Sequence, residues 1–220
     1  MLDNLSMTAN SETGDELLLV EEIQHRVVNE YAILVASLNR RAQGCADPIR
    51  AFLVETSERL KAFAAVHRAL LLPRGEIAVD LGEYLQELCS ALTHATLAER
   101  GVSLVLYEAS VSVEAHRAWR VGLIVSELVT NAVRHGSWKH VGGVIEVEVV
   151  SGPATVECRV SDNGGGSIGL ASGRGTHIVA ALAQEIGGRI HREFNEHGVT
   201  VLLTFPCWST GDTSPSVYTA

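Results

Sequence analysis

The sequence predicts an α-helical hairpin followed by an α+β domain, in which helices cover one face of a mixed, largely antiparallel sheet. Three observations predict this fold class. Apolar residues in 15–71 recur at steps of three and four, the spacing of packed helices. Apolar and polar residues alternate in 144–160 and again in 189–205, as they do in half-buried strands. A further helical pattern at 114–135 precedes these strands, so helices and sheet are expected to belong to one domain.

The composition is that of an ordinary folded protein, with 220 residues of which 46% are hydrophobic and 20% charged. Its net charge of -9 argues against nucleic-acid binding, which needs clustered basic residues. The four cysteines have neither metal-ligand nor redox-motif spacing, and no apolar run is long enough to cross a bilayer. The N-terminus is polar and acidic, unlike a signal peptide. We therefore expect a cytoplasmic protein that binds neither nucleic acid nor membrane.

The first helix is expected from about Asp15 to Gln43, where Gly44 ends it. Residues 1–14 are polar and lack periodicity, so we expect them to be disordered. The apolar seam of the helix passes through Val27, and His25 lies about 200° around the helix from that residue. His25 is therefore expected to point towards solvent.

A second helix is expected to begin with Asp47 as its N-cap and Pro48 in its first helical position, and to end near Leu71. The short link favours an antiparallel hairpin, so residues 15–72 are expected to form one unit. Two helices bury too little apolar surface to be stable alone. We expect either a homodimer through this unit, as a four-helix bundle, or docking of the hairpin on the rest of the chain.

Residues 80–206 are expected to form the second domain, after a linker at 72–79. Its first helix opens with Asp80 and Glu83, which have the spacing of a capping box. The tail at 207–220 is polar and expected to be loose. The expected helices are 80–99, 114–135 and 175–186, and the expected strands are 102–107, 144–150, 154–160, 189–194 and 199–205.

The helix over 121–135 carries polar residues on an otherwise apolar pattern. Glu127, Asn131 and His135 are spaced four apart, so they lie on one face. A carboxylate, an amide and an imidazole are costly in such a place unless they serve a function. Two interpretations stay open at this point: a core helix whose polar groups are satisfied by neighbours, or one wall of a binding site.

A glycine-rich segment follows the strand at 154–160. Asp162 can accept hydrogen bonds from an exocyclic amine, and the glycines after it let the backbone approach a flat ring or phosphates. Gly173 and Gly175 lead into the next helix, whose N-terminus can bind an anion. Asp, Asn and Gly are also common turn residues, so this segment alone would read as a turn. Its combination with the polar helix favours a nucleotide site.

These motifs carry a resemblance to a known family. EEIQHRVVNEYAILVASL resembles the phosphoacceptor helix of sensor histidine kinases with the H-R-x-x-N motif. SELVTNAVRHG is similar to the N box of that family, SDNGGG to its first glycine box and GRGTHIVAALAQEIGG to its second. The resemblance covers about residues 16–206, with the motifs in family order. It implies a dimerisation and phosphotransfer hairpin, followed by an ATP-binding domain of the GHKL or Bergerat type.

The resemblance also implies roles for individual residues. His25 would be the phosphoacceptor, and Asn29 would hold water for the reverse dephosphorylation. Asn131 would ligate the Mg²⁺ that bridges the phosphates of ATP, and Glu127 would orient or activate the nucleophile. Asp162 would bind the adenine amine. Glycines would shape the nucleotide pocket, and two basic side chains could contact phosphate, although the histidine of the two could instead only cap the end of its helix. The glycines are Gly164, Gly166, Gly173 and Gly175, and the two side chains are Arg174 and His135.

Two departures from the family pattern leave two hypotheses open. Only residues 167–172 separate the glycine boxes, where the family carries a longer lid over the nucleotide. Too few residues precede His25 to form an input domain, so either a separate sensor protein supplies the input or the protein is not a sensor. The first hypothesis is an ATP-dependent histidine kinase that phosphorylates His25 and then an aspartate of a response-regulator receiver domain. The alternative is a non-catalytic phosphotransferase or response-regulator phosphatase with a degenerate ATP domain. Intact Glu127, Asn131 and Asp162 favour the first hypothesis.

Overall fold

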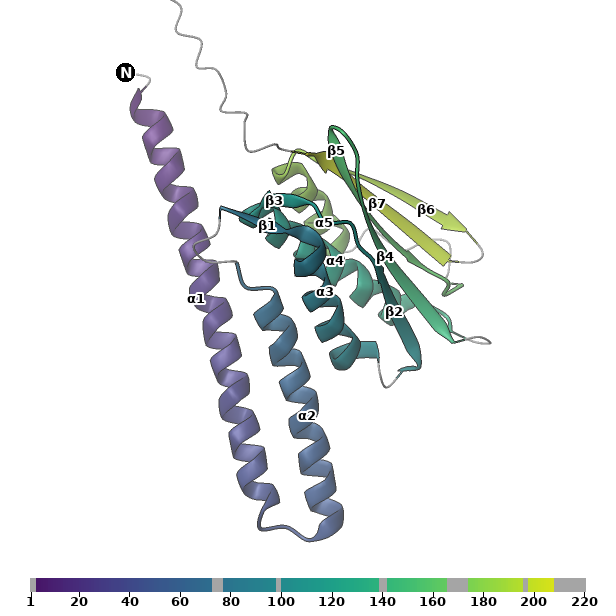
Figure 1. The fold of residues 1–220 in the computed structure, drawn as a ribbon. Coiled ribbons are helices and arrows are strands. Elements are labelled where there is room, and N and C mark those ends of the chain that lie inside the picture. The colour runs from purple at the N-terminus through teal and green to yellow at the C-terminus, as the bar shows by residue number, and fades with distance from the viewer. Residues whose placement is uncertain are drawn as a thin grey trace, which may run out of the picture. The chain divides into compact units, whose positions relative to one another are not determined.

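The computed structural model describes residues 3–72, 77–97, 100–138, 142–165, 174–195 and 198–207. The chain divides into two compact units, Met1–Leu72 and Pro73–Ala220 (Figure 1). In the described residues the first unit is helical, and the second combines helices with two sheets. The predicted fold class, a helical hairpin followed by an α+β domain, is confirmed.

Two antiparallel helices, α1 (Asp3–Ala42) and α2 (Asp47–Ala69), form the first unit (Figure 1). The side-chain amide of Gln24 donates to the carbonyl oxygen of Leu70 at 3.3 Å. The ring centroids of Tyr31 and His67 lie 5.4 Å apart. These contacts place the middle of α1 beside the C-terminal end of α2, as the short connection at residues 43–46 requires.

Two boundaries of the hairpin differ from the prediction. Helix α1 begins at Asp3, so the backbone of residues 3–14 is helical where disorder was predicted. A helix extends at little cost once a stable stretch has nucleated it, and no proline interrupts these residues. The predicted N-cap role of Asp47 is wrong, because Ala46 is the N-cap of α2. Asp47 lies in the first turn, where a carboxylate interacts favourably with the helix dipole.

The second unit is built on a five-stranded sheet of order β2-β4-β5-β7-β6. β2 and β4 are parallel and the other neighbours are antiparallel. The helices α3, α4 and α5 cover one face of this sheet (Figure 1). The strands are β2 (Val102–Tyr107), β4 (Gly143–Ser151), β5 (Thr155–Asp162), β6 (Arg189–Asn195) and β7 (Gly198–Pro206), and the helices are α3 (Leu81–Leu92), α4 (Ala115–His135) and α5 (Arg174–Glu185).

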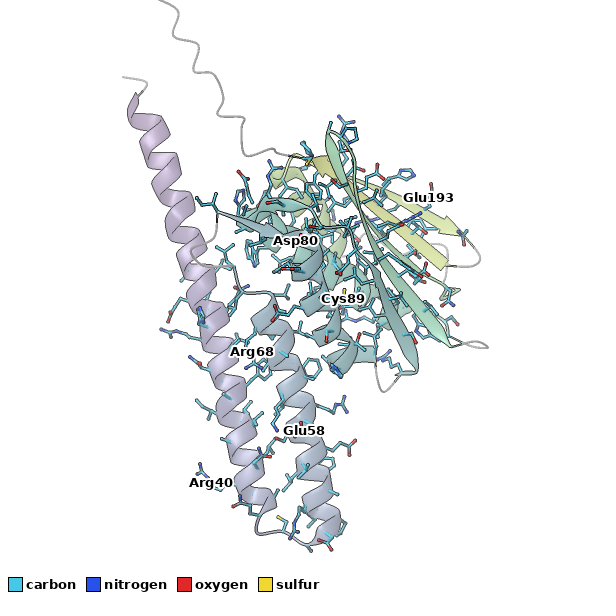
Figure 2. All side chains as sticks on the ribbon, viewed as in Figure 1. Arg40, Glu58, Arg68, Asp80, Cys89 and Glu193 are labelled. Carbon is cyan, nitrogen blue, oxygen red and sulfur yellow. The ribbon has the colours of Figure 1, made fainter. Side chains whose placement is uncertain are left out.

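A small second sheet at the start of this unit was not predicted. In it β1 (Ala78–Asp80) pairs with β3 (Ser112–Glu114) in an antiparallel arrangement. The two strands were missed because three residues are too few to show an alternating pattern. Asp80 lies where β1 ends and α3 begins (Figure 2). Its carboxylate accepts a hydrogen bond from the backbone N–H of Glu83 at 3.0 Å, which confirms the predicted cap. Helix α3 ends at Leu92 rather than Glu99, and a π-helical turn at Thr93–Leu97 follows it.

The core of the second unit lies between the sheet and its helices. Alternate residues of the central strands are buried, such as Ile145 and Val147 of β4 and Leu203 and Phe205 of β7. Val125, on the inner side of α4, is fully buried with them. All four cysteines are free thiols. No described helix has the length and apolar character that a membrane span needs. Of the tail predicted to be loose, only residue 207 lies within the described residues.

Candidate functional site

The predicted polar face of α4 contains a direct hydrogen bond. The amide nitrogen Nδ2 of Asn131 donates to Oε1 of Glu127 at 2.9 Å, and both side chains are half-buried. The opposite side of the helix is apolar and buried, for example at Val125 and Val129, which fixes the face on which the pair lies. Because Asn131 uses its NH₂ group in this bond, its oxygen is the atom that can ligate a cation.

The first turn of α5 lies directly on this pair. A Cβ atom added to Gly175 would overlap Oε1 of Glu127 and would lie 2.9 Å from its Cδ. Only glycine therefore allows the backbone of α5 to approach the carboxylate so closely. An ion pair between Arg120 and Glu185, with Nε and Oε2 2.5 Å apart, also joins α4 to α5. The structure thus brings together three predicted site residues, Glu127, Asn131 and Gly175.

Asp162 is the last residue of β5 and is half-buried. Its Oδ1 accepts a hydrogen bond from the backbone N–H of Gly164 at 2.9 Å. Burial raises the pKa of Asp162 above its ordinary value, while hydrogen bonds from the backbone N–H groups of Gly164 and Val199 act in the opposite direction. Asp162 is therefore a partly desolvated acceptor in a turn, a suitable partner for a ligand amine.

The turn after Asp162 is attached to two other elements. Asn163 accepts a hydrogen bond from the backbone N–H of Val144 on its Oδ1 at 2.8 Å, and its own N–H donates to the carbonyl of Val144 at 3.1 Å. Gly164 is buried against the end of α4, where a Cβ on Gly164 would lie 2.9 Å from Cα of Gly136. The turn after Asp162 is therefore in contact with the C-terminal end of α4, the helix that carries Asn131. This contact allows Asp162 and Asn131 to belong to a single site.

The remaining predicted residues are placed as follows. His135 is exposed at the end of α4. His25 and Asn29 lie on α1 in the other unit, where Asn29 is exposed and His25 is half-buried. The prediction that His25 faces solvent is thus only partly correct, because the side of α1 that meets α2 includes the neighbouring Gln24. Gly166, Gly173 and the side chain of Arg174 lie outside the described residues.

Gly198 contributes to the site without having been predicted. Its φ of 149° is a conformation that side chains rarely allow, and a Cβ there would overlap the backbone carbonyl of Asp162. It therefore fixes how closely β7 passes the Asp162 turn. In the sequence Gly198 lies between two expected strands, so its position predicts only a glycine in the turn of a β-hairpin. No sequence signal pairs it with a residue 36 positions earlier.

Comparison with known protein families gives two matches along the chain. Residues 22–96 match the model of a family described as "Histidine kinase". Residues 88–205 match the model described as "Histidine kinase-like ATPase domain". The second match covers more than half of the chain and contains Glu127, Asn131, Asp162 and Gly175.

Individual proteins from two bacteria are also similar to the chain. "Blue-light-activated histidine kinase 2" of Erythrobacter litoralis is 29% identical over 197 residues, which cover 84% of this chain and 56% of that protein. "Sensor histidine kinase PdtaS" of Mycobacterium tuberculosis is 25% identical over 201 residues, which cover 87% of this chain and 40% of that protein. The chain thus spans about half the length of these relatives or less.

Among solved structures, the histidine kinase domain of the Erythrobacter litoralis EL346 blue-light-activated histidine kinase has the same fold. It superposes with a TM-score of 0.58 at 20% identity, over 81% of this chain and 96% of that one. The longer EL346 structure gives a TM-score of 0.55 at 22% identity, over 81% of this chain and 60% of that one.

Proposed function

The chain belongs to the histidine kinase-like ATPase family, and from this premise we propose that it is a two-component histidine kinase. It binds ATP in the second unit, phosphorylates His25 of the first unit and passes the phosphoryl group to an aspartate of a response-regulator receiver domain. The observation that carries the proposal is the Asn131–Glu127 pair under the first turn of α5, joined through Gly136 and Gly164 to the Asp162 turn.

Each part of this site has a chemical task. Asp162 accepts a hydrogen bond from the exocyclic amine of adenine. The amide oxygen of Asn131 is a hard ligand of the kind that Mg²⁺ prefers. In nucleotide sites Mg²⁺ is commonly ligated by one or two protein oxygens together with oxygens of the substrate phosphates. When bound, the metal supplies charge neutralisation at those phosphates. The N-terminus of α5, whose second residue Gly175 lies against Glu127, favours an anion. Gly164 and Gly175 shape this pocket. We assign the same role to Gly166 and Gly173, and a phosphate contact to the guanidinium of Arg174, all of which lie outside the described residues. His135, exposed at the end of α4, is a further group for a phosphate contact.

The transfer step itself needs a nucleophile and a proton acceptor. A lone pair of the His25 imidazole attacks the γ-phosphorus, the bond to the leaving oxygen of ADP breaks, and the imidazole proton passes to a carboxylate. We assign Glu127 as that carboxylate, since only its Oε1 is engaged by Asn131. Asn29, one helical turn after His25 on α1, holds the water for the reverse dephosphorylation.

A homodimer through residues 15–72 follows from the surface of the hairpin. On α1 the apolar side chains of Val20, Ile23 and Leu34 are exposed. On α2 the side chain of Phe52 is 66% exposed. Exposed apolar side chains on both helices support an interaction surface here, and two hairpins can cover them by forming a four-helix bundle.

The proposal is tested by incubating the protein with γ-labelled ATP and Mg²⁺. Acid-labile label is expected on the wild type and absent from His25→Ala, because phosphohistidine forms only at that residue. His191→Ala is the control for loss of a histidine elsewhere in the chain, since His191 lies on β6 of the second unit and its replacement should not affect labelling. Label that persists in His25→Ala refutes the assignment. No label together with no ATP binding supports the alternative, a phosphotransferase or phosphatase with a degenerate ATP domain.

A further inference from the structure

Trp138 lies in a cradle formed by three glycines from three different elements. Gly136 caps α4, Gly143 begins β4, and Gly164 belongs to the turn after Asp162. A Cβ added to these glycines would lie 2.7 Å from Cε2, 2.8 Å from Cδ2 and 3.0 Å from Cζ3 of the indole, respectively. Real side-chain carbons do not approach so closely, so the ring contacts all three backbones at once.

The indole is held there by shape rather than by hydrogen bonding. Its Nε1 atom is buried and has no hydrogen-bond partner among the described residues. A buried indole N–H usually finds a partner, and leaving it without one is unfavourable. A phenylalanine or leucine would avoid this cost but would leave part of the cradle empty. The wide ring of Trp138 is therefore what fills the space between the three glycine backbones.

The same turn holds the carboxylate of Asp162. The N–H of Gly164 donates to Oδ1 of Asp162 at 2.9 Å, and the Cα of that glycine lies against the indole. The adjoining Asn163 is hydrogen-bonded to Val144, the residue after Gly143. Two sides of the cradle thus belong to the strand and turn that orient Asp162. If the indole is removed, Gly164 keeps its contact with Gly136 but loses the ring against which its other neighbouring atoms pack.

We propose that Trp138 is a positioning residue for Asp162, and that it thereby determines the selectivity of the site for a purine with an exocyclic amine. The inference rests on the proposed function, since the ligand is an adenine nucleotide. A site that is arranged to accept a hydrogen bond from an amine discriminates strongly against a ligand without it. When the acceptor is no longer held, this discrimination falls while the other contacts remain.

The test compares the binding of ADP and purine riboside 5′-diphosphate, which lacks the amine, by titration calorimetry. Trp138→Leu is expected to weaken ADP binding about tenfold and to change binding of the analogue by less than about twofold. Gly143→Ala, which pushes a methyl group into the indole, should likewise lower the ratio of the affinity for ADP to the affinity for the analogue. Gly142→Ala is the matched control, because the nearest atom to its Cβ is the Gly101 carbonyl oxygen at 3.9 Å.

A double variant separates positioning from general destabilisation. Removal of the indole makes room for the methyl group, so Trp138→Leu and Gly143→Ala should be non-additive. Three results overturn the inference: equal losses of affinity for ADP and the analogue, an unchanged ratio of the two affinities in either single variant, or additive effects of the two substitutions on that ratio.

Amide hydrogen exchange tests the inference even if the wild type binds no nucleotide, which would refute only the proposed function. Trp138→Leu is expected to accelerate exchange of the Gly164 amide about tenfold or more. The Gly152 amide, which donates to the carbonyl of Thr155 at 2.8 Å in another turn, should be unaffected. Unchanged protection at Gly164 overturns the inference. Trp138→Phe, which keeps an aromatic ring in the cradle, should give an intermediate rate and replaces the leucine variant if that one does not fold.

Discussion

Replacement of Gly175 by alanine should separate stability from nucleotide binding. Gly175 is the second residue of α5, and its new Cβ would overlap Oε1 of Glu127. The carboxylate is the end of a flexible side chain, so it can rotate away without moving the backbone. In doing so it loses the hydrogen bond of 2.9 Å from Asn131. Asn131, the proposed metal ligand, is then no longer held in place.

The magnitude follows from two opposing terms. A hydrogen bond to a charged group contributes about 1.5–3 kcal/mol, and the lower end applies because both side chains are half-buried. Alanine is more favourable than glycine in a helix by up to about 1 kcal/mol. The free energy of unfolding should therefore change by less than about 1 kcal/mol. Affinity for Mg²⁺–ATP should fall about tenfold, equivalent to about 1.4 kcal/mol, because Asn131 must be ordered again on binding.

Urea denaturation measures the free energy of unfolding. Titration calorimetry with a non-hydrolysable ATP analogue and Mg²⁺ measures the affinity for the nucleotide. Gly142→Ala, where the nearest atom to the new Cβ is the Gly101 carbonyl oxygen at 3.9 Å, controls for the effect of a methyl group on a glycine of the same unit. If Gly175→Ala binds the analogue as tightly as wild type, Glu127 does not orient Asn131 for the metal. A loss of stability above about 3 kcal/mol would show instead that the carboxylate cannot rotate aside.

Three further predictions concern stability, pH and assembly. Gly198→Ala should lower the free energy of unfolding in urea by about 3 kcal/mol or more, because the backbone carbonyl of Asp162 cannot move aside. Gly187→Ala, at a φ of 68° but without an overlap, should cost only about 1–2 kcal/mol, and equal losses would contradict this account. Because burial raises the folded-state pKa of Asp162, its contribution to stability is complete below its unfolded value of 3.8 and is lost as pH rises through the folded pKa. The unfolding free energy of Asp162→Asn relative to wild type should therefore increase as the pH rises above 3.8, and a constant difference would refute this. Phe52→Asp should convert a dimer to a monomer in sedimentation velocity, whereas Ile77→Asp, at an 86% exposed position of the second unit, should leave the dimer intact.

Local rules explain why much of the fold could be predicted. The four-residue spacing of Glu127 and Asn131 fixes their geometry on any α-helix, and the structure has the expected contact at 2.9 Å. Asp80 caps α3 because a capping residue acts on an N–H only three residues away. The boundaries at Asp3 and Leu92 were missed because helix ends depend on small energies that neighbouring turns can change.

The order of the long helices and of the strands of the five-stranded sheet, the polar face of α4 and the acidic turn at Asp162 could all be predicted, because each depends on residues close together in the chain. The surroundings of these residues become visible only once the chain is folded. Gly175 lies on Glu127, Gly198 passes Asp162, and Trp138 fills the glycine cradle. These contacts join residues from different elements, and their distances depend on how a whole sheet packs against its helices.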